Sequence, residues 1–191
     1  QALGKVIAGA DRATRLVEQL LRLARLDPLL RLEDPQPIDL VALAHAACED
    51  AAPAAAGRSQ RLAVDCPADP LIVSGDRDLL AAALRNLVDN ALRYTPEGGT
   101  VTIRASQEHG ETCLAVIDDG PGVPPDELSR LVERFYRGSD NVAEGSGLGL
   151  AIVRRIAELH GARLEVENRA EGGFLARIRC CATPDTPNAP T

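Results

Sequence analysis

Residues 79–94 read LLAAALRNLVDNALRY, and this stretch decides the fold. Leucine and alanine favour a helix, whereas asparagine is a poor helix former because its amide competes for backbone hydrogen bonds. Asn86 and Asn90 are four residues apart, so their carboxamides lie on one helix face and point at the same partner. The apolar residues at spacings of three and four form the opposite, core-facing stripe: Leu84, Leu87, Val88 and Ala91.

Arg93 follows Asn90 by about one turn of the same helix. Amide oxygens beside a guanidinium suit a hard cation bound to an anion, as when Mg²⁺ is bound to phosphates. The helix therefore predicts a site for a metal–phosphate complex.

Composition limits the classes of protein to consider. The chain has 191 residues, of which 45% are hydrophobic, so it can form one domain with a proper core plus an appendage. A net charge of -7 argues against general affinity for nucleic acid. Five cysteines without CxxC spacing indicate buried thiols in a reducing compartment rather than a disulfide framework. No apolar run approaches the ~20 residues that cross a bilayer, and no signal peptide is visible, so we expect this chain not to insert into a membrane.

The first 27 residues predict a bundle helix that seeks partner helices. Its apolar seam repeats every three and four residues, as in a heptad pattern, and comprises Leu3, Val6, Ala10, Ala13, Val17, Leu20 and Ala24. An ordinary amphipathic helix packed on its own domain is the alternative. Asp27-Pro28 ends the helix, and the proline-containing residues 28–38 indicate a linker. Because the chain lacks an initial Met and starts within this pattern, we expect it to be part of a longer protein.

The remainder predicts an α+β fold, a two-layer α/β sandwich. A mixed sheet of about five strands is covered on one face by about three helices, and the bundle helix precedes it. Helices are expected at 39–56, capped by Asp39, from Asp76 to about 95, from Pro124-Pro125, and at 148–160. Strands are expected at 61–66, 71–74, 101–106, 112–117, 163–168 and 174–181. The domain spans 39–182, and residues 183–191 read as a disordered tail.

Two further segments carry binding chemistry. Asp118-Asp119-Gly120-Pro121-Gly122 places carboxylates at the end of an apolar strand, where one can accept a hydrogen bond from an exocyclic amine such as that of adenine. A plain Asp-Gly turn is the alternative. Residues 145–150, GSGLGL, run into a helix whose N-terminus can receive phosphate oxygens. They form neither a Walker loop, since Lys5 is the only lysine, nor the dinucleotide fingerprint.

Four segments in this order resemble the nucleotide-binding boxes of bacterial sensor histidine kinases. They are 86–90, NLVDN; 118–122, DDGPG; 134–137, RFYR; and 145–149, GSGLG. The resemblance covers almost the whole chain, because residues 1–26 look like the second helix of that family's dimerisation and phosphotransfer hairpin.

The resemblance implies a role for each matching residue. Asn90 would be the main Mg²⁺ ligand, with Asn86 supporting the ion and Arg93 near the phosphates. Tyr94 would lie against the adenine, and Asp118 would bind its amino group.

Further ligand contacts are implied by the remaining boxes. Gly120 and Gly122 would shape the base pocket, and Arg137 would reach the γ-phosphate. Residues 138–146 would be a lid that orders on binding nucleotide. Its hinge and phosphate-facing turn would comprise Gly145, Ser146, Gly147, Leu148 and Gly149.

By the same resemblance, the protein would bind ATP and Mg²⁺ and donate the γ-phosphoryl group to a histidine upstream of this chain. The phosphate would pass to an aspartate of a response-regulator receiver domain. The intact protein would be a homodimer through the hairpin, and this chain would be the cytoplasmic portion of an inner-membrane sensor. The family's acceptor histidine and its following Arg-Thr-Pro run are absent here, and His45, His109 and His160 read as structural residues. Where many relatives have Thr after a glycine pair, this chain has Phe174, which leaves no hydroxyl for the base.

Two other classes remain open at this point. The first is an ATP-driven clamp like the gyrase, chaperone and mismatch-repair ATPases, which use a glutamate base at the position of Asn86. An amide cannot accept that proton, so the residue argues against hydrolysis. The second is a nucleotide-sensing or anti-sigma module that acts by binding a partner without phosphorylating a histidine.

Overall fold

The computed structural model describes residues 32, 34–131, 133, 136 and 147–180. Within them the α-helices are α2 (Leu40–Ala56), α3 (Arg77–Tyr94) and α4 (Gly149–Leu159). The strands are β1 (Gln36–Asp39), β2 (Arg61–Asp65), β3 (Ile72–Gly75), β4 (Thr100–Glu108), β5 (Glu111–Asp118), β6 (Ala162–Asn168) and β7 (Phe174–Cys180).

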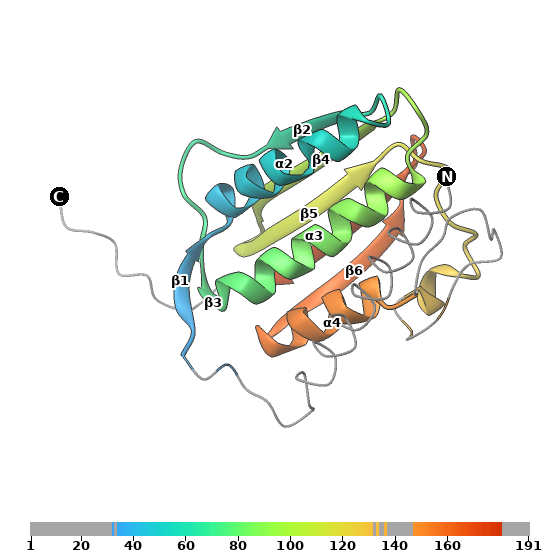
Figure 1. Ribbon diagram of the computed structural model, residues 1–191. Helices are drawn as coiled ribbons and strands as arrows, with labels where there is room; N and C mark the ends of the chain where they lie inside the picture. Colours follow the sequence, from blue (N-terminus) through green and yellow to red (C-terminus); the bar gives the residue numbers. More distant parts are fainter. Residues whose placement is uncertain (1–31, 33, 132, 134–135, 137–146, 181–191) are drawn as a thin grey trace, which may run out of the picture.

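The main sheet has five strands in the order β2-β4-β5-β7-β6. The pair β2–β4 is parallel and the other pairs are antiparallel, so the sheet is mixed. Helices α2, α3 and α4 lie side by side over one face of it (Figure 1). The predicted two-layer α+β fold is confirmed for the described residues.

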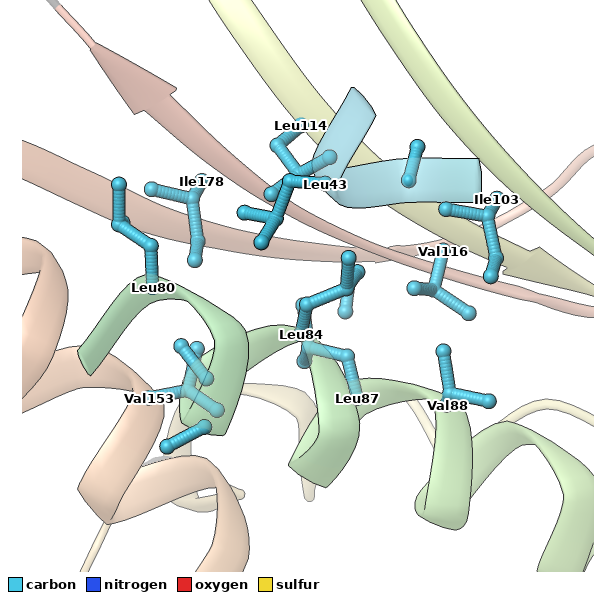
Figure 2. Close-up of a cluster of buried hydrophobic side chains, with 14 of the residues drawn as sticks. Leu43, Leu80, Leu84, Leu87, Val88, Ile103, Leu114, Val116, Val153 and Ile178 are labelled. Atoms are coloured by element: carbon cyan, nitrogen blue, oxygen red, sulfur yellow. The ribbon is translucent and has the colours of Figure 1, made fainter. Parts of the chain in front are cut away.

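The hydrophobic core lies between these helices and the sheet. Helix α3 presents the stripe expected from its spacing, and Leu84 is 0% exposed. Figure 2 shows this stripe meeting sheet residues, with α2 and α4 contributing from either side. The labelled members are Leu43, Leu80, Leu84, Leu87, Val88, Ile103, Leu114, Val116, Val153 and Ile178. Helix α3 lies between α2 and α4 (Figure 1), and its apolar stripe packs on the sheet.

The proline-rich segment differs from the expectation of a linker over 28–38. Residues 36–39 form β1, which pairs antiparallel with β3 in a separate two-stranded ribbon. Each strand of a two-stranded ribbon has one unpaired edge. Proline is tolerated in β1 because the nitrogen of Pro37, which carries no hydrogen, can face that edge. The predicted strand at 71–74 is therefore present, shifted by one residue, but it lies outside the main sheet.

Two helix starts were predicted from their capping residues, and both are confirmed. The Asp39 side chain accepts a hydrogen bond from the Val41 amide at 2.9 Å. Asp76 accepts from the amides of Asp78 and Leu79 at 2.9 and 3.0 Å. Each carboxylate satisfies amides that have no partner within the helix.

His160 joins the C-terminus of α4 to the N-terminus of α3. Its Nδ1 donates to the Ile156 carbonyl oxygen at 2.7 Å, and its Nε2 accepts from the Asp76 amide at 3.0 Å. One neutral tautomer satisfies both bonds. Gly75 allows this approach, since a Cβ there would lie 2.4 Å from the His160 ring. The structural role expected for His160 is confirmed.

Ion pairs cross the face of the sheet opposite the helices. Glu165 accepts hydrogen bonds from Arg163 at 2.8 Å and Arg177 at 2.6 Å, and Arg179 contacts it at 3.4 Å. Partial burial opposes ionisation of Glu165, but the bonds from these guanidinium groups outweigh it and lower the pKa of Glu165 to about 2.

Several predicted features lie outside the described residues. They are the bundle helix at 1–27, Arg137, the lid at 138–146 with Gly145 and Ser146, and the tail at 183–191. The short helix expected from Pro124-Pro125 is, in the described part, a turn followed by one 3₁₀ segment, Leu128–Arg130. Within the described residues no helix combines the length and apolar character that crossing a bilayer requires.

Candidate functional site

The two asparagines of α3 meet the first residue of α4. A Cβ atom built on Gly149 would lie 3.5 Å from Asn86 Oδ1, 3.4 Å from Asn90 Nδ2 and 3.7 Å from Asn90 Oδ1. Asn86 Nδ2 donates to the Ala82 carbonyl oxygen at 2.8 Å, which turns its Oδ1 toward α4. The predicted pairing of the amides on one face is thus observed, and Gly149 is the residue on which they converge.

The start of α4 is anchored by an apolar side chain. Leu148 stands at the N-cap position and is 0% exposed, so only its backbone can face a ligand. Gly147 has φ 69°, a left-handed conformation that suits glycine. The first turn of a helix carries backbone N–H groups and partial positive charge, so anionic oxygens are favoured there. The side-chain amide oxygens of Asn86 and Asn90 and the backbone N–H groups at the start of α4 therefore lie at the same place.

Asp118 ends β5 and is 4% exposed. Its carboxylate accepts from the Gly120 amide at 2.9 Å and from the Phe174 amide. Burial raises the pKa of Asp118, and these backbone donors only partly offset the effect. A buried carboxylate held by backbone donors has a fixed direction, as recognition of an amine requires.

The neighbouring Asp119 has a different role. Both of its carboxylate oxygens accept from the Thr100 amide, at 2.8 and 2.9 Å, where β4 begins. The pair of carboxylates noted in the sequence therefore divides into a buried residue, Asp118, and an exposed one that secures the sheet edge.

The C-terminal half of α3 links the two groups of site residues. Beyond Asn90, Arg93 is half-buried and Tyr94 is 52% exposed. The Tyr94 carbonyl oxygen would lie 3.0 Å from a Cβ on Gly120, so the loop after Asp118 packs directly on the end of α3. An exposed aromatic ring at this end of α3 can cover a planar ligand.

Gln60, which the sequence did not predict as a site residue, supports this end of α3. Gln60 Nε2 donates to the carbonyl oxygens of Leu92 at 2.9 Å and Thr95 at 2.5 Å, and Arg58 Nη1 also donates to Leu92 at 3.0 Å. These bonds satisfy carbonyl groups that α3 itself cannot satisfy. No local pattern signals them, because the partners are more than 30 residues apart in the chain.

The turn between β6 and β7, which the resemblance associated with the base, packs on the end of β5. A Cβ on Gly173 would lie 2.0 Å from the Asp118 carbonyl oxygen, so this turn packs on the Asp118 backbone. Asn168 hydrogen-bonds Val123, on the loop that follows Asp118. The resemblance associated this glycine pair with the base only through the following residue, Phe174, and predicted neither the packing on Asp118 nor the role of Asn168.

The oxygen donors at this site suit a hard metal ion that is also bound by phosphate. No group of three or more histidine, cysteine, aspartate or glutamate side chains is placed to hold a metal ion within the described residues. The carboxamide oxygens of Asn86 and Asn90 fit a hard cation that takes its other oxygens from a phosphate ligand and water. Mg²⁺ suits this donor set because it retains much of its coordination from phosphate and water.

Comparisons with known proteins show the family to which the chain belongs. Residues 75–184 match the family model described as histidine kinase-, DNA gyrase B-, and HSP90-like ATPase. The chain is similar to the sensor protein QseC of Salmonella typhi, with 45% identity over 179 residues, which is 94% of this chain and 39% of that protein. The chain thus spans about two fifths of the length of the curated relatives it matches.

Two solved structures support the same relationship. The cytoplasmic segment of histidine kinase QseC aligns with TM-score 0.65 and 34% identity, over 91% of this chain and 95% of that one. Full-length ShkA in complex with AMPPNP aligns with TM-score 0.80 and 31% identity, over 95% of this chain and 38% of that one.

Proposed function

Because the chain belongs to the histidine kinase-, DNA gyrase B-, and HSP90-like ATPase family, and its relatives include sensor histidine kinases, we propose that it is a sensor-kinase catalytic core. It binds MgATP and transfers the γ-phosphoryl group to a histidine upstream of this sequence. The observation that carries the proposal is the meeting of Asn86 and Asn90 with the start of α4 at Gly149. ATP binding itself follows from membership of the family.

At the base end, Asp118 receives the adenine amino group. Its low exposure and its bonds from the Gly120 and Phe174 amides keep the carboxylate in place. Gly120 and Gly122 let the loop after Asp118 pack closely on Tyr94 and Asn168, which shapes the base pocket, and the exposed Tyr94 ring covers the base. A guanine would present a carbonyl where adenine has its amine, so the same carboxylate disfavours it.

At the phosphate end, Asn90 and Asn86 would provide oxygens for Mg²⁺, which when bound would neutralise phosphate charge. Arg93 adds positive charge from the next turn of α3, and the backbone at Gly147 and Gly149 donates to phosphate oxygens. Phosphoryl transfer asks a protein mainly for alignment and charge neutralisation, and these groups supply both.

Roles for three residues rest on the family resemblance, because they lie outside the described residues. Arg137 reaches the γ-phosphate, and Gly145 and Ser146 belong to the lid over the nucleotide. We further propose that residues 1–27 are the second helix of the dimerisation hairpin, that 28–35 join it to a catalytic domain that begins with β1 and extends to 182, and that 183–191 are a tail.

The wider assignment is also a proposal. The intact protein forms a homodimer, passes its phosphate to a response-regulator receiver domain and does not act on nucleic acid. The solved QseC structure is described as a cytoplasmic segment, which supports the same placement for this chain within an inner-membrane sensor. The ShkA complex with AMPPNP, an ATP analogue, supports adenine nucleotide as the ligand.

The comparisons do not support the two alternatives, a clamp ATPase and a partner-binding module without kinase activity. Asn86 stands where the clamp enzymes have their glutamate base, and a carboxamide cannot deprotonate water. Transfer to a protein acceptor therefore fits this site better than hydrolysis.

The test is a phosphoryl-transfer assay on the parent chain and on the variant Asn90→Ala. The chain is incubated with Mg²⁺, γ-labelled ATP and a separately made helical hairpin that carries an acceptor histidine. Acid-labile, base-stable label on the hairpin is the expected result, and Asn90→Ala should abolish it. Rapid phosphate release without label on the hairpin would overturn the kinase assignment in favour of a hydrolase.

A further inference from the structure

Asn168, the last residue of β6, holds a loop that lies 45 residues earlier in the chain. Its Oδ1 accepts from the Val123 amide at 2.9 Å, and its Nδ2 donates to the Val123 carbonyl oxygen at 2.6 Å. One side chain thus pairs with both backbone groups of one residue, as a neighbouring strand would do.

The loop is shaped to receive this amide. Gly122 has φ 74°, and a Cβ on it would lie 2.8 Å from Asn168 Oδ1, so only glycine lets the backbone come this close. At its other end, the loop is fixed by the bond from the Gly120 amide to Asp118 Oδ1. Residues 120–123 are therefore anchored at both ends, once by Asp118 and once by Asn168.

The turn that follows Asn168 touches Asp118 as well. The Arg169 amide donates to the Gly173 carbonyl oxygen at 3.1 Å, which closes the turn, and Arg169 Nη1 lies 3.4 Å from the Asp118 carbonyl oxygen. The buried carboxylate and the loop beyond it are thus buttressed from the same side by the β6–β7 connection.

The loop contributes little to the hydrophobic core. Pro121 is exposed, and Gly122 and Val123 are half-buried. Loss of the Asn168 bonds would free the loop without opening a cavity in the core. The stability of the fold should therefore change less than the affinity of the binding site.

We propose that Asn168 is a positioning residue for recognition of the base. By clamping Val123 it holds Gly120 and Gly122 in the conformation that admits adenine beside Asp118, and it thereby sets affinity for the nucleotide without taking part in phosphoryl transfer. This inference rests on the proposed function, since it assigns the loop to the adenine end of the ATP site.

Two variants test the clamp. Asn168→Ala removes both bonds. Asn168→Asp has nearly the same shape and keeps the acceptor for the Val123 amide, but sets a carboxylate oxygen against the Val123 carbonyl oxygen. The matched control is Glu167→Ala, which alters the adjacent, exposed position and one 3.8 Å ion pair with Arg177.

Calorimetric titration with ADP and MgATP should show binding roughly tenfold weaker in both Asn168 variants, the scale of one to two net hydrogen bonds. The control should bind like the parent chain. In the transfer assay, KM for ATP should rise by the same factor while kcat at saturating ATP stays unchanged. Amide exchange at Val123 should accelerate, and exchange in α3 should not.

The outcomes separate the two hypotheses. If the parent chain binds neither nucleotide, the proposed function fails. If the parent binds and both Asn168 variants bind equally well, or if kcat falls while KM is constant, the clamp is refuted. Should Asn168→Ala fail to fold, the near-isosteric Asn168→Asp decides the question alone.

Discussion

Gly173→Ala should damage the site through a clash with the Asp118 backbone. The new Cβ would lie 2.0 Å from the Asp118 carbonyl oxygen and 2.9 Å from its carbonyl carbon, whereas real Cβ atoms essentially never come within 3.0 Å of another residue. The obstacle is backbone at the end of β5, so no side-chain rotation relieves it. Gly173 also has φ 97°, which an L-residue adopts only with strain.

Gly172→Ala is a matched control, because it separates the backbone strain from the steric clash. Gly172 has φ 92° but nothing within 4 Å of its would-be Cβ, so this variant carries the backbone strain without the clash. Strain of this kind costs about 1–3 kcal/mol. Overpacking costs a further 1–3 kcal/mol or so, which only Gly173→Ala should show.

Thermal and urea unfolding give the stability difference between the two variants, which should amount to roughly 5 °C in midpoint for a chain of this size. Titration with ADP gives the second measurement. Gly173→Ala should bind much more weakly because the strand end that carries Asp118 has moved, and Gly172→Ala should bind normally. Equal stability and equal affinity in the two variants would refute the close packing of this turn on Asp118.

Three further predictions concern separate parts of the molecule. Asn90→Ala should weaken MgATP binding at least about tenfold while the unfolding midpoint changes little, since a half-exposed polar truncation leaves no core cavity; equal affinity would count against the metal site. Burial raises the pKa of Asp118 above the usual 3.8, so Asp118 becomes protonated at a higher pH than an exposed aspartate would. As the pH is lowered, ATP affinity should therefore begin to fall at that higher pH, and Asp118→Asn should remove this decrease from measurements of affinity against pH. The Glu165 pKa of about 2 lies below the ordinary 4.5, so its ion pairs stabilise the fold above pH 4.5 and lose that effect as pH falls toward 2. With a 30% exposed side chain the effect should be about 1 kcal/mol after solvent screening, and acid unfolding of Glu165→Gln should be correspondingly less steep in that window.

Sequence reasoning succeeded where the determinant is local. Asp39 and Asp76 cap their helices as expected, and Gly161, with φ 63°, follows the end of α4. The strands expected at 101–106 and 112–117 form a hairpin whose turn contains His109 and Gly110, and both residues have positive φ. Each of these features is determined by one or two neighbouring residues, so short patterns suffice to predict them.

Features that depend on a partner distant in the sequence could not be predicted from the sequence. Strand β1 has no strand-like pattern, because Pro35 and Pro37 argue against one, and it forms only because β3 pairs with it. For the same reason Asn168 could not be recognised, since its partner Val123 is brought close by the order of strands in the sheet. The roles of Asn86 and Asn90 were suggested by spacing, but the contact with Gly149 required the packing of α3 on α4.

The His160 bonds have a mechanical consequence for α4. They pin the far end of the helix to Asp76, while its near end meets the asparagines at Gly149. An α-helix of 11 residues is about 16 Å long. A ligand that displaced the near end sideways by about 1 Å would therefore tilt the helix by only 3–4° or so about a fixed pivot, and β6, which follows directly after the pivot, would hardly move. The pivot lies at the end of α4 remote from the proposed phosphate site, so displacement by a bound nucleotide would be taken up within α4.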